Sequence, residues 1–121
     1  VAGRLPMMVS ANCVKKTAAL CDHKAEYMQL RDRRMMDMPV KTHCTFCYNT
    51  IYNAAPLSLS GVAAELRGLK LGSLRILLTN ETAEESKTAV RSVHRSFVLG
   101  EQGGAEAYEN FTRGHFRKGV E

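Results

Sequence analysis

The chain has 121 residues, 45% of them hydrophobic, and a formal net charge of +5. This length and composition are typical of one globular domain with a buried core. There is no run of about 18 or more apolar residues and no apolar leader after Val1, so the sequence predicts neither a membrane span nor a secretory signal. Because the chain does not begin with Met, we expect a processed product or a fragment of a longer protein.

The first half of the chain is predicted to contain little regular structure. Residues 5–10 are mostly apolar and predict a short buried strand. Residues 11–38 are polar and basic with no sustained hydrophobic period, which predicts an irregular segment. Long irregular segments are usually functional or disordered, and the two cysteines in this one favour a metal tether. Residues 39–42 are expected to be extended and to lead to the next pair of cysteines.

The second half is predicted to alternate strands and helices. Short strands are expected at residues 57–59 and 74–79, separated by a helix over residues 60–69 that Ser60 can cap. The apolar face of this helix is predicted to consist of Val62, Ala63, Leu66 and Leu69. Gly72 is a suitable turn residue after it.

A capping box predicts the start of the last helix. Thr82 is the expected N-cap and Glu85 the residue three positions later, and the helix should run to about residue 99. Its apolar stripe is predicted to be Val90, Val93 and Phe97. The order strand–helix–strand–helix implies a right-handed crossover and a parallel sheet, that is, an α/β fold.

Four cysteines are the most distinctive feature of the sequence: Cys13, Cys21, Cys44 and Cys47. The C-x2-C pair turns tightly enough to place two sulfurs on one metal, and four thiolates suit either tetrahedral zinc or a four-cysteine iron–sulfur cluster. Spacing alone leaves zinc and iron–sulfur equal. The alternatives are buried packing thiols and structural disulfides. Since no secretion signal is present, we expect a reducing, cytoplasmic compartment, where thiols more often bind metal.

The basic C-terminal end is a candidate anion site. Its residues are Arg113, His115, Arg117 and Lys118. Basic groups can contact phosphates, including those of RNA, although the same residues are equally well explained as a solvated tail. His23 and His43 lie next to cysteines and could be alternative metal ligands. Histidines in such positions more often donate hydrogen bonds to the ligands or are simply exposed. The sequence contains no recognisable nucleophile triad, P-loop or dinucleotide fingerprint.

Three stretches of the sequence resemble one protein family. They are the residues leading to Cys13 (LPMMVSANC), the residues around the second cysteine pair (LRDR, then PV, then CTFCYNTIYN), and the ending FTRGHF. Together they resemble the C-terminal region of the larger members of peptidase family U32, the collagenase-like peptidases. The resemblance spans nearly the whole chain and is most specific between Cys44 and Asn53.

The resemblance implies a fold and a cofactor. The family is built on a (β/α) scaffold, so we expect a partial (β/α) barrel-like fragment with parallel strands and a cysteine-bearing irregular loop region. Residues 1–121 would form a single domain or fragment of a larger U32-type protein. Within it we expect a cysteine metal-binding segment at 11–53, a strand–helix–strand–helix unit at 54–99 and a basic tail at 100–121. Carried over to this chain, the cluster ligands are Cys13, Cys21, Cys44 and Cys47, and the cofactor is a 4Fe–4S cluster, with zinc as the alternative.

The resemblance also implies functions for the parent protein. Better-understood relatives resemble oxygen-independent hydroxylation factors acting on RNA or on a small aromatic. The alternatives are a collagenase-like peptidase segment and a non-catalytic zinc-binding module. The family segment that pairs Glu and His with a Cys motif is absent, so this piece alone is expected to be inactive, with the rest of the parent as its partner. Unpaired strand edges of a truncated barrel would favour self-association.

Overall fold

The computed structural model describes residues 1–102, 106 and 108–117. The chain divides into two compact units, and each is described by itself. The first unit contains residues 1–4 together with residues 55–121, and the second contains residues 5–54. No helix in the described part of the chain is long and apolar enough to cross a membrane.

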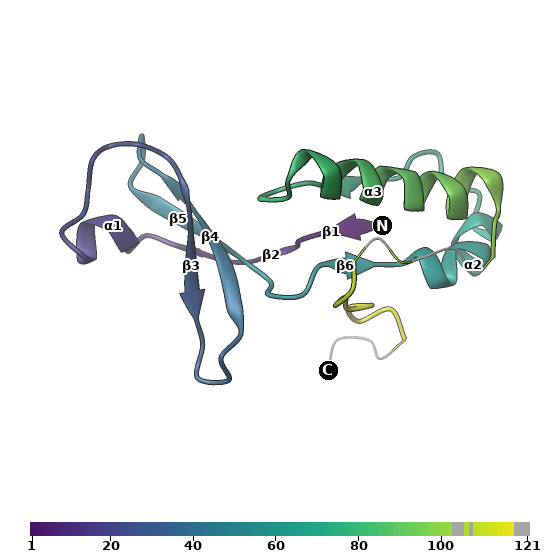
Figure 1. Ribbon diagram of the computed structural model, residues 1–121, viewed down its shortest axis with the longest axis horizontal. Coiled ribbons are helices and arrows are strands. Elements are labelled where there is room, and N and C mark those ends of the chain that lie inside the picture. The colour runs from purple at the N-terminus through teal and green to yellow at the C-terminus, as the bar shows by residue number, and fades with distance from the viewer. Residues whose placement is uncertain (103–105, 107, 118–121) are drawn as a thin grey trace. The chain divides into compact units, whose positions relative to one another are not determined.

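The second unit is built on a four-stranded antiparallel sheet with the strand order β2-β5-β4-β3 (Figure 1). Its elements in chain order are β2 (Pro6–Ser10), the short helix α1 (Val14–Thr17), β3 (Tyr27–Arg31), β4 (Asp37–His43) and β5 (Tyr48–Tyr52). Short turns join β3 to β4 and β4 to β5, and turns of this length permit only antiparallel pairing.

One face of this sheet is buried and the other is partly exposed. Alternation places Val40, Thr42, Asn49 and Ile51 on the buried face, each at most 7% exposed. Strand β2 lies at the edge of the sheet and is largely exposed, with Met7 at 64% and Val9 at 65%. The prediction of a strand at residues 5–10 is therefore confirmed, whereas its predicted burial is wrong: residues 6–9 are exposed on both faces of the strand.

The first unit combines a small sheet with a helical layer. Its elements are β1 (Ala2–Gly3), β6 (Leu57–Ser58), the short η1 (Ser60–Val62), α2 (Ala63–Gly68), β7 (Ile76–Leu77), α3 (Ala83–Val93) and the π-helical η2 (His94–Leu99). The core consists of Ala2, Val62, Ala63, Leu66, Val93 and Phe97. Helix α3 runs along β1 in Figure 1, which is how Val93 comes to pack with Ala2.

The predicted fold class, a partial (β/α) barrel-like fragment with parallel strands, is wrong. Among the described strands only β1 and β7 pair in parallel, apart from an isolated parallel bridge between Leu57 and Thr112. Strand β1 also pairs with β6 antiparallel, giving the order β6-β1-β7. The N-terminal strand β1 thus lies between β6 and β7. Because β1 is antiparallel to β6 and parallel to β7, β6 and β7 run in opposite directions, whereas the two strands of a βαβ unit are parallel. No barrel closes among these strands, and the remaining sheet is entirely antiparallel.

The local predictions in this unit fare differently. The capping box is confirmed: Thr82 N donates to Glu85 Oε2 (2.7 Å), and Glu85 N donates to Thr82 Oγ1 (3.3 Å). Val93 and Phe97 are buried as predicted, but Val90 is 46% exposed. Ser60 does not cap a helix through its side chain, and the helix ends at Gly68, which leaves Leu69 66% exposed.

The predicted irregular segment at residues 11–38 is also partly wrong. It contains α1, β3 and the start of β4. Strand β3 pairs residue by residue with β4, from Tyr27 opposite Lys41 to Arg31 opposite Asp37. The local signal for β3 is short: Met28 and Leu30 alternate with the exposed Gln29 and Arg31, a pattern that covers only a few residues of the polar segment.

Candidate metal centre

The backbone places three of the four cysteines, Cys13, Cys44 and Cys47, at the same end of the β2-β5-β4-β3 sheet. Cys13 lies three residues after β2, and Cys44 and Cys47 lie in the turn that joins β4 to β5. Because β2 and β4 both pair with β5, the end of β2 and the β4–β5 turn lie at one end of the sheet: Ser10 is opposite Asn49, and His43 is opposite Tyr48. Helix α1 then leads from Cys13 towards Cys21.

Asn49 connects two of these segments. It is 0% exposed and is paired with Ser10 on one side and with Thr42 on the other. Its side-chain Nδ2 donates to the carbonyl oxygen of Asn12, the residue before Cys13. The strand that begins one residue after Cys47 therefore holds the residue that precedes Cys13. Asn49 Oδ1 is buried without a hydrogen-bond partner in the described part of the chain.

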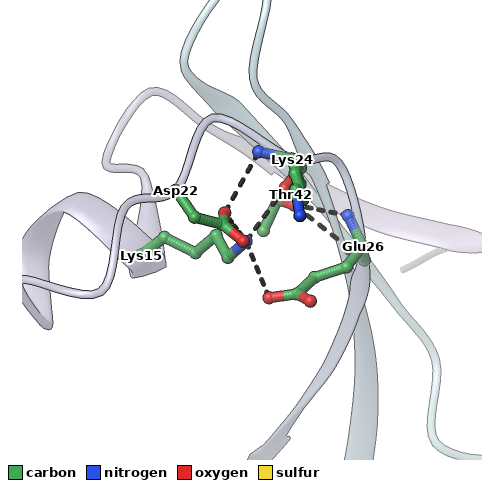
Figure 2. Close-up of polar contacts among 5 residues, drawn as sticks. All are labelled: Lys15, Asp22, Lys24, Glu26 and Thr42. Atoms are coloured by element: carbon green, nitrogen blue, oxygen red, sulfur yellow. Dashed lines mark hydrogen bonds and ion pairs between the residues drawn. The ribbon is translucent and has the colours of Figure 1, made fainter.

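Lys15 connects the segment that contains Cys21 to the same end of the sheet (Figure 2). It follows Cys13 by two residues and is only 2% exposed. Its Nζ donates to Asp22 Oδ1 and to the backbone carbonyl of Lys24 (3.0 Å), and it lies 2.8 Å from Glu26 Oε1. An ammonium group has three donors, and here each has an oxygen partner. The charge is therefore buried with full compensation.

The polar network continues from Glu26 to β4. Glu26 N donates to Thr42 Oγ1 (2.9 Å), and Thr42 N donates to the Glu26 carbonyl (2.9 Å). Thr42 is fully buried and lies two residues before Cys44. One connected set of contacts, drawn in Figure 2, therefore runs from helix α1 through residues 22–26 to the strand that leads to the second cysteine pair.

The hydrogen bonds and charges of this network shift the pKa values of Lys15 and Asp22. Hydrogen bonds to Asp22 and then to Glu26 raise the pKa of Lys15 above its usual value. The hydrogen bond from Lys15, followed by the one from the Lys24 backbone, lowers the pKa of Asp22 to about 2. Both groups therefore remain charged at neutral pH, as a compensated buried ion pair requires.

Strained backbone flanks the cysteines. Cys47 itself has a φ of 52°, and Ala19 and His23, two residues either side of Cys21, have φ values of 55° and 60°. Left-handed backbone costs a residue with a Cβ atom about 1–2 kcal/mol and persists only where the surrounding contacts impose it. Such residues concentrate at functional sites, which makes this end of the sheet the strongest candidate site in the unit.

The thiols themselves are free, and none forms a disulfide. Cys13 is buried, Cys44 is half-buried, and Cys21 and Cys47 are exposed. Cys47 Sγ lies 3.7 Å from the Cys44 carbonyl, which closes the turn between them. Within the described ranges, no three His, Cys, Asp or Glu side chains lie close enough together to hold a metal ion. The type and backbone placement of the cysteines suit a four-thiolate site, but their side-chain positions do not form one.

The two histidines beside the cysteines have different surroundings. The ring of His43 stacks on Tyr48 (centroids 4.2 Å apart), and its Nε2 lies 3.1 Å from Thr50 Oγ1. These contacts make His43 part of the sheet face. His23 is exposed.

The predicted anion-binding residues have different surroundings where the structure describes them. Arg117 pairs with Glu65 (2.9 Å), His115 is exposed, and Lys118 lies outside the described residues. Arg113 Nη2 lies close to Gly61, 3.0 Å from where a Cβ atom on that glycine would be.

Sequence reasoning missed Lys15 and Asn49. Lys15 lies in a basic, polar stretch, and a helix of four residues is too short to show in its sequence period which face is buried. The two acidic residues seven and eleven positions later were the available signal. Asn49 gave no signal, because its role depends on the pairing of β5 with two other strands.

Comparison with known proteins adds no relative: no family model, curated protein or solved structure matches the chain.

Proposed function

We propose that residues 5–54 form a four-cysteine metal-binding module, with a 4Fe–4S cluster as its cofactor, within the C-terminal portion of a larger cytoplasmic U32-type protein. The observation that carries this proposal is the convergence of Cys13, Cys44 and Cys47 at one end of the sheet, with Cys21 connected to it through Lys15 and Asp22. Free thiols from four cysteines are the donor set that such a cluster uses.

The proposed activity belongs to the parent protein. By its resemblance to family U32, that protein would hydroxylate RNA or a small aromatic, and this chain would supply the metal centre. No residue of the chain is assigned a catalytic role. The basic composition of the chain, with a net charge of +5, is compatible with an RNA substrate.

The test is anaerobic reconstitution of the purified chain with ferrous iron and sulfide. We expect a brown protein with visible charge-transfer absorption and about four irons per chain, the content of a 4Fe–4S cluster. Replacing any one of the four cysteines with serine should lower the iron content. Thr45→Ala is the matched control, since Thr45 is an exposed, non-ligating residue between Cys44 and Cys47.

Two results would count against this proposal. A colourless, iron-free protein after reconstitution would exclude the cluster. One zinc per chain in protein purified without added metal, with unfolding on chelation, would identify a closed zinc module instead.

A further inference from the structure

A cavity in the unit formed by residues 1–4 and 55–121 has no role in the proposed metal centre. It has a volume of about 290 Å³ and lies between the segment η1–α2 and the turn that ends η2. Four of its lining residues are small and lack polar side chains: Gly61, Ala63, Ala64 and Gly100. Its polar side chains are those of Ser60, Arg67, Ser96, Glu101 and Gln102. Those groups decide which ligand the cavity can accept.

Arg67 is the principal charged group of the cavity. Its guanidinium lies against Gly100: a Cβ atom at that position would be 2.2 Å from Arg67 Nη1. Gly100 also has a φ of 74°, a left-handed backbone conformation that favours glycine there. Among the described residues, Arg67 has no hydrogen bond or ion pair through its side chain.

Two serine hydroxyls line the same cavity. Ser60 Oγ is buried and has no hydrogen-bond partner in the part of the chain that the structure describes. Ser96 is 5% exposed. A buried hydroxyl without a partner is destabilising unless a ligand or water satisfies it.

A second guanidinium borders the cavity on the side of Gly61. Arg113 Nη2 would lie 3.0 Å from a Cβ atom on Gly61, and Glu106 Oε1 would lie 3.4 Å from it. The carboxylates nearby have other partners. Glu106 accepts a hydrogen bond from Ser58, and Glu101, which lines the cavity, pairs with Arg95 (3.6 Å). Within the described part of the chain, Arg67 and Arg113 are therefore the cationic groups at this site without an ion pair to a carboxylate.

We infer that this cavity binds a phosphate group, held by Arg67 and the hydroxyls of Ser60 and Ser96, with Arg113 at the rim. A guanidinium presents paired N–H donors that match two phosphate oxygens, and serine hydroxyls donate to the others. The small residues of the walls allow these donors to approach the anion. The site lies outside the cysteine unit, and its binding does not depend on metal.

Calorimetric titration of the full chain with inorganic phosphate, without added metal, tests this inference. We expect saturable binding that weakens by about tenfold or more in Arg67→Met, because a charge-assisted hydrogen bond and its ion pair are lost. Arg91→Met is the control. It removes an exposed arginine of α3 that does not line this cavity, and it should leave binding unchanged.

A second variant distinguishes a loss of phosphate binding from a loss of folding. Ser60→Ala removes one hydroxyl and should weaken phosphate binding several-fold while the far-ultraviolet circular dichroism stays unchanged. Equal phosphate affinity in the wild type, Arg67→Met and Ser60→Ala would overturn the inference, as would the absence of binding to the wild type.

The source of the phosphate is distinguished by two further probes. Adenosine monophosphate binding as tightly as inorganic phosphate, or more tightly, would indicate a phosphomonoester ligand. Tighter binding of a short oligoribonucleotide, weakened by salt and by Arg67→Met alike, would indicate a phosphodiester. Oligonucleotide binding that Arg67→Met does not affect would place RNA elsewhere on the chain and count against this cavity as its site.

Discussion

Lys15 joins three parts of the polypeptide through one side chain. Its ammonium group holds Asp22, the carbonyl of Lys24 and Glu26, and Glu26 in turn is bonded to Thr42 on β4. The Lys15 side chain is 3% exposed, whereas those of Asp22 and Glu26 are each 48% exposed, so removing the lysine leaves two half-exposed carboxylates without their shared cation. The segment around Cys21 therefore depends on a residue that lies two positions after Cys13.

Lys15→Met should release residues 22–26 from the sheet. The side chain keeps a similar length and loses its charge, so Asp22 and Glu26 become solvated and the bonds to Thr42 weaken. We expect amide hydrogen exchange in residues 22–26 and at Thr42 to accelerate by about tenfold or more, as for a segment that opens locally. Hydrogen exchange with mass spectrometry measures this change.

Lys16→Met is the matched control for this prediction. Lys16 is the next residue on the same helix and is exposed, so its replacement should leave exchange in residues 22–26 unchanged. Equal exchange in the two variants would mean that Lys15 does not hold the segment.

At the scale of single elements, α3 is the part of the fold that the sequence predicted best. Its N-terminus is determined by Thr82 and Glu85, three residues apart, and each satisfies a backbone N–H near the other. Such a cap depends on local sequence alone. Strand β3 depends on its pairing with β4, and the place of β1 depends on residues more than fifty positions away, so neither could be predicted in the same manner.

The cap of α3 should weaken in acid. Hydrogen bonds from the backbone and side chain of Thr82 lower the pKa of Glu85 below its usual value. A lowered folded-state pKa contributes stability that is present above the unfolded pKa of about 4.3 and is lost as the pH falls through the folded value. Glu85→Gln should therefore reduce the loss of thermal stability between neutral pH and the acid range.

Glu84→Gln serves as the control for this acid dependence. Glu84 lies in the same first turn but pairs with Lys87 on the helix surface and does not bond to the N-cap. Melting curves by circular dichroism over a pH series compare the variants. If Glu85→Gln and the wild type lose stability in parallel as the pH falls, the cap is not the source of the acid dependence.

Strand β2 gives the molecule an exposed edge. Its outer side has no partner strand in the described part of the chain, and Met7 and Val9 are more than half exposed. Edges of this kind favour pairing with another chain. An antiparallel pairing of β2 with β2 of a second copy would be self-complementary, so we expect the isolated chain to self-associate through this edge.

Light scattering over a concentration series checks this expectation. The mean mass of the wild type should rise with concentration, and Val9→Lys should reduce the rise by placing like charges at the paired edge. Gln29→Lys is the control, because Gln29 is exposed on β3 at the opposite edge of the sheet. A wild type that stays monomeric at every concentration would show that β2 does not pair in this way.

At the scale of the whole molecule, the chain is two units and not one barrel fragment. Local periodicity predicts alternating strands and helices over residues 54–99, and the structure has helices α2 and α3 there. Periodicity does not, however, determine which strands pair. Pairing placed β1 between β6 and β7 and made the remaining sheet antiparallel. The cysteine spacing predicts a shared site, which stays a prediction, because the positions of the cysteine side chains depend on contacts such as those of Asn49 that spacing does not contain.

The pairing of β1 with β6 and β7 makes the first unit discontinuous in sequence, since residues 5–54 lie between its two parts. The inserted unit begins and ends at one place, because Asn53 N donates to the Leu5 carbonyl at 3.0 Å. A module whose entry and exit points touch can be gained, lost or exchanged by a single recombination event, with little effect on the chain around it. Because its two ends meet, the cysteine unit has the geometry of an insertion, a block of chain that can enter or leave a host domain without stretching it.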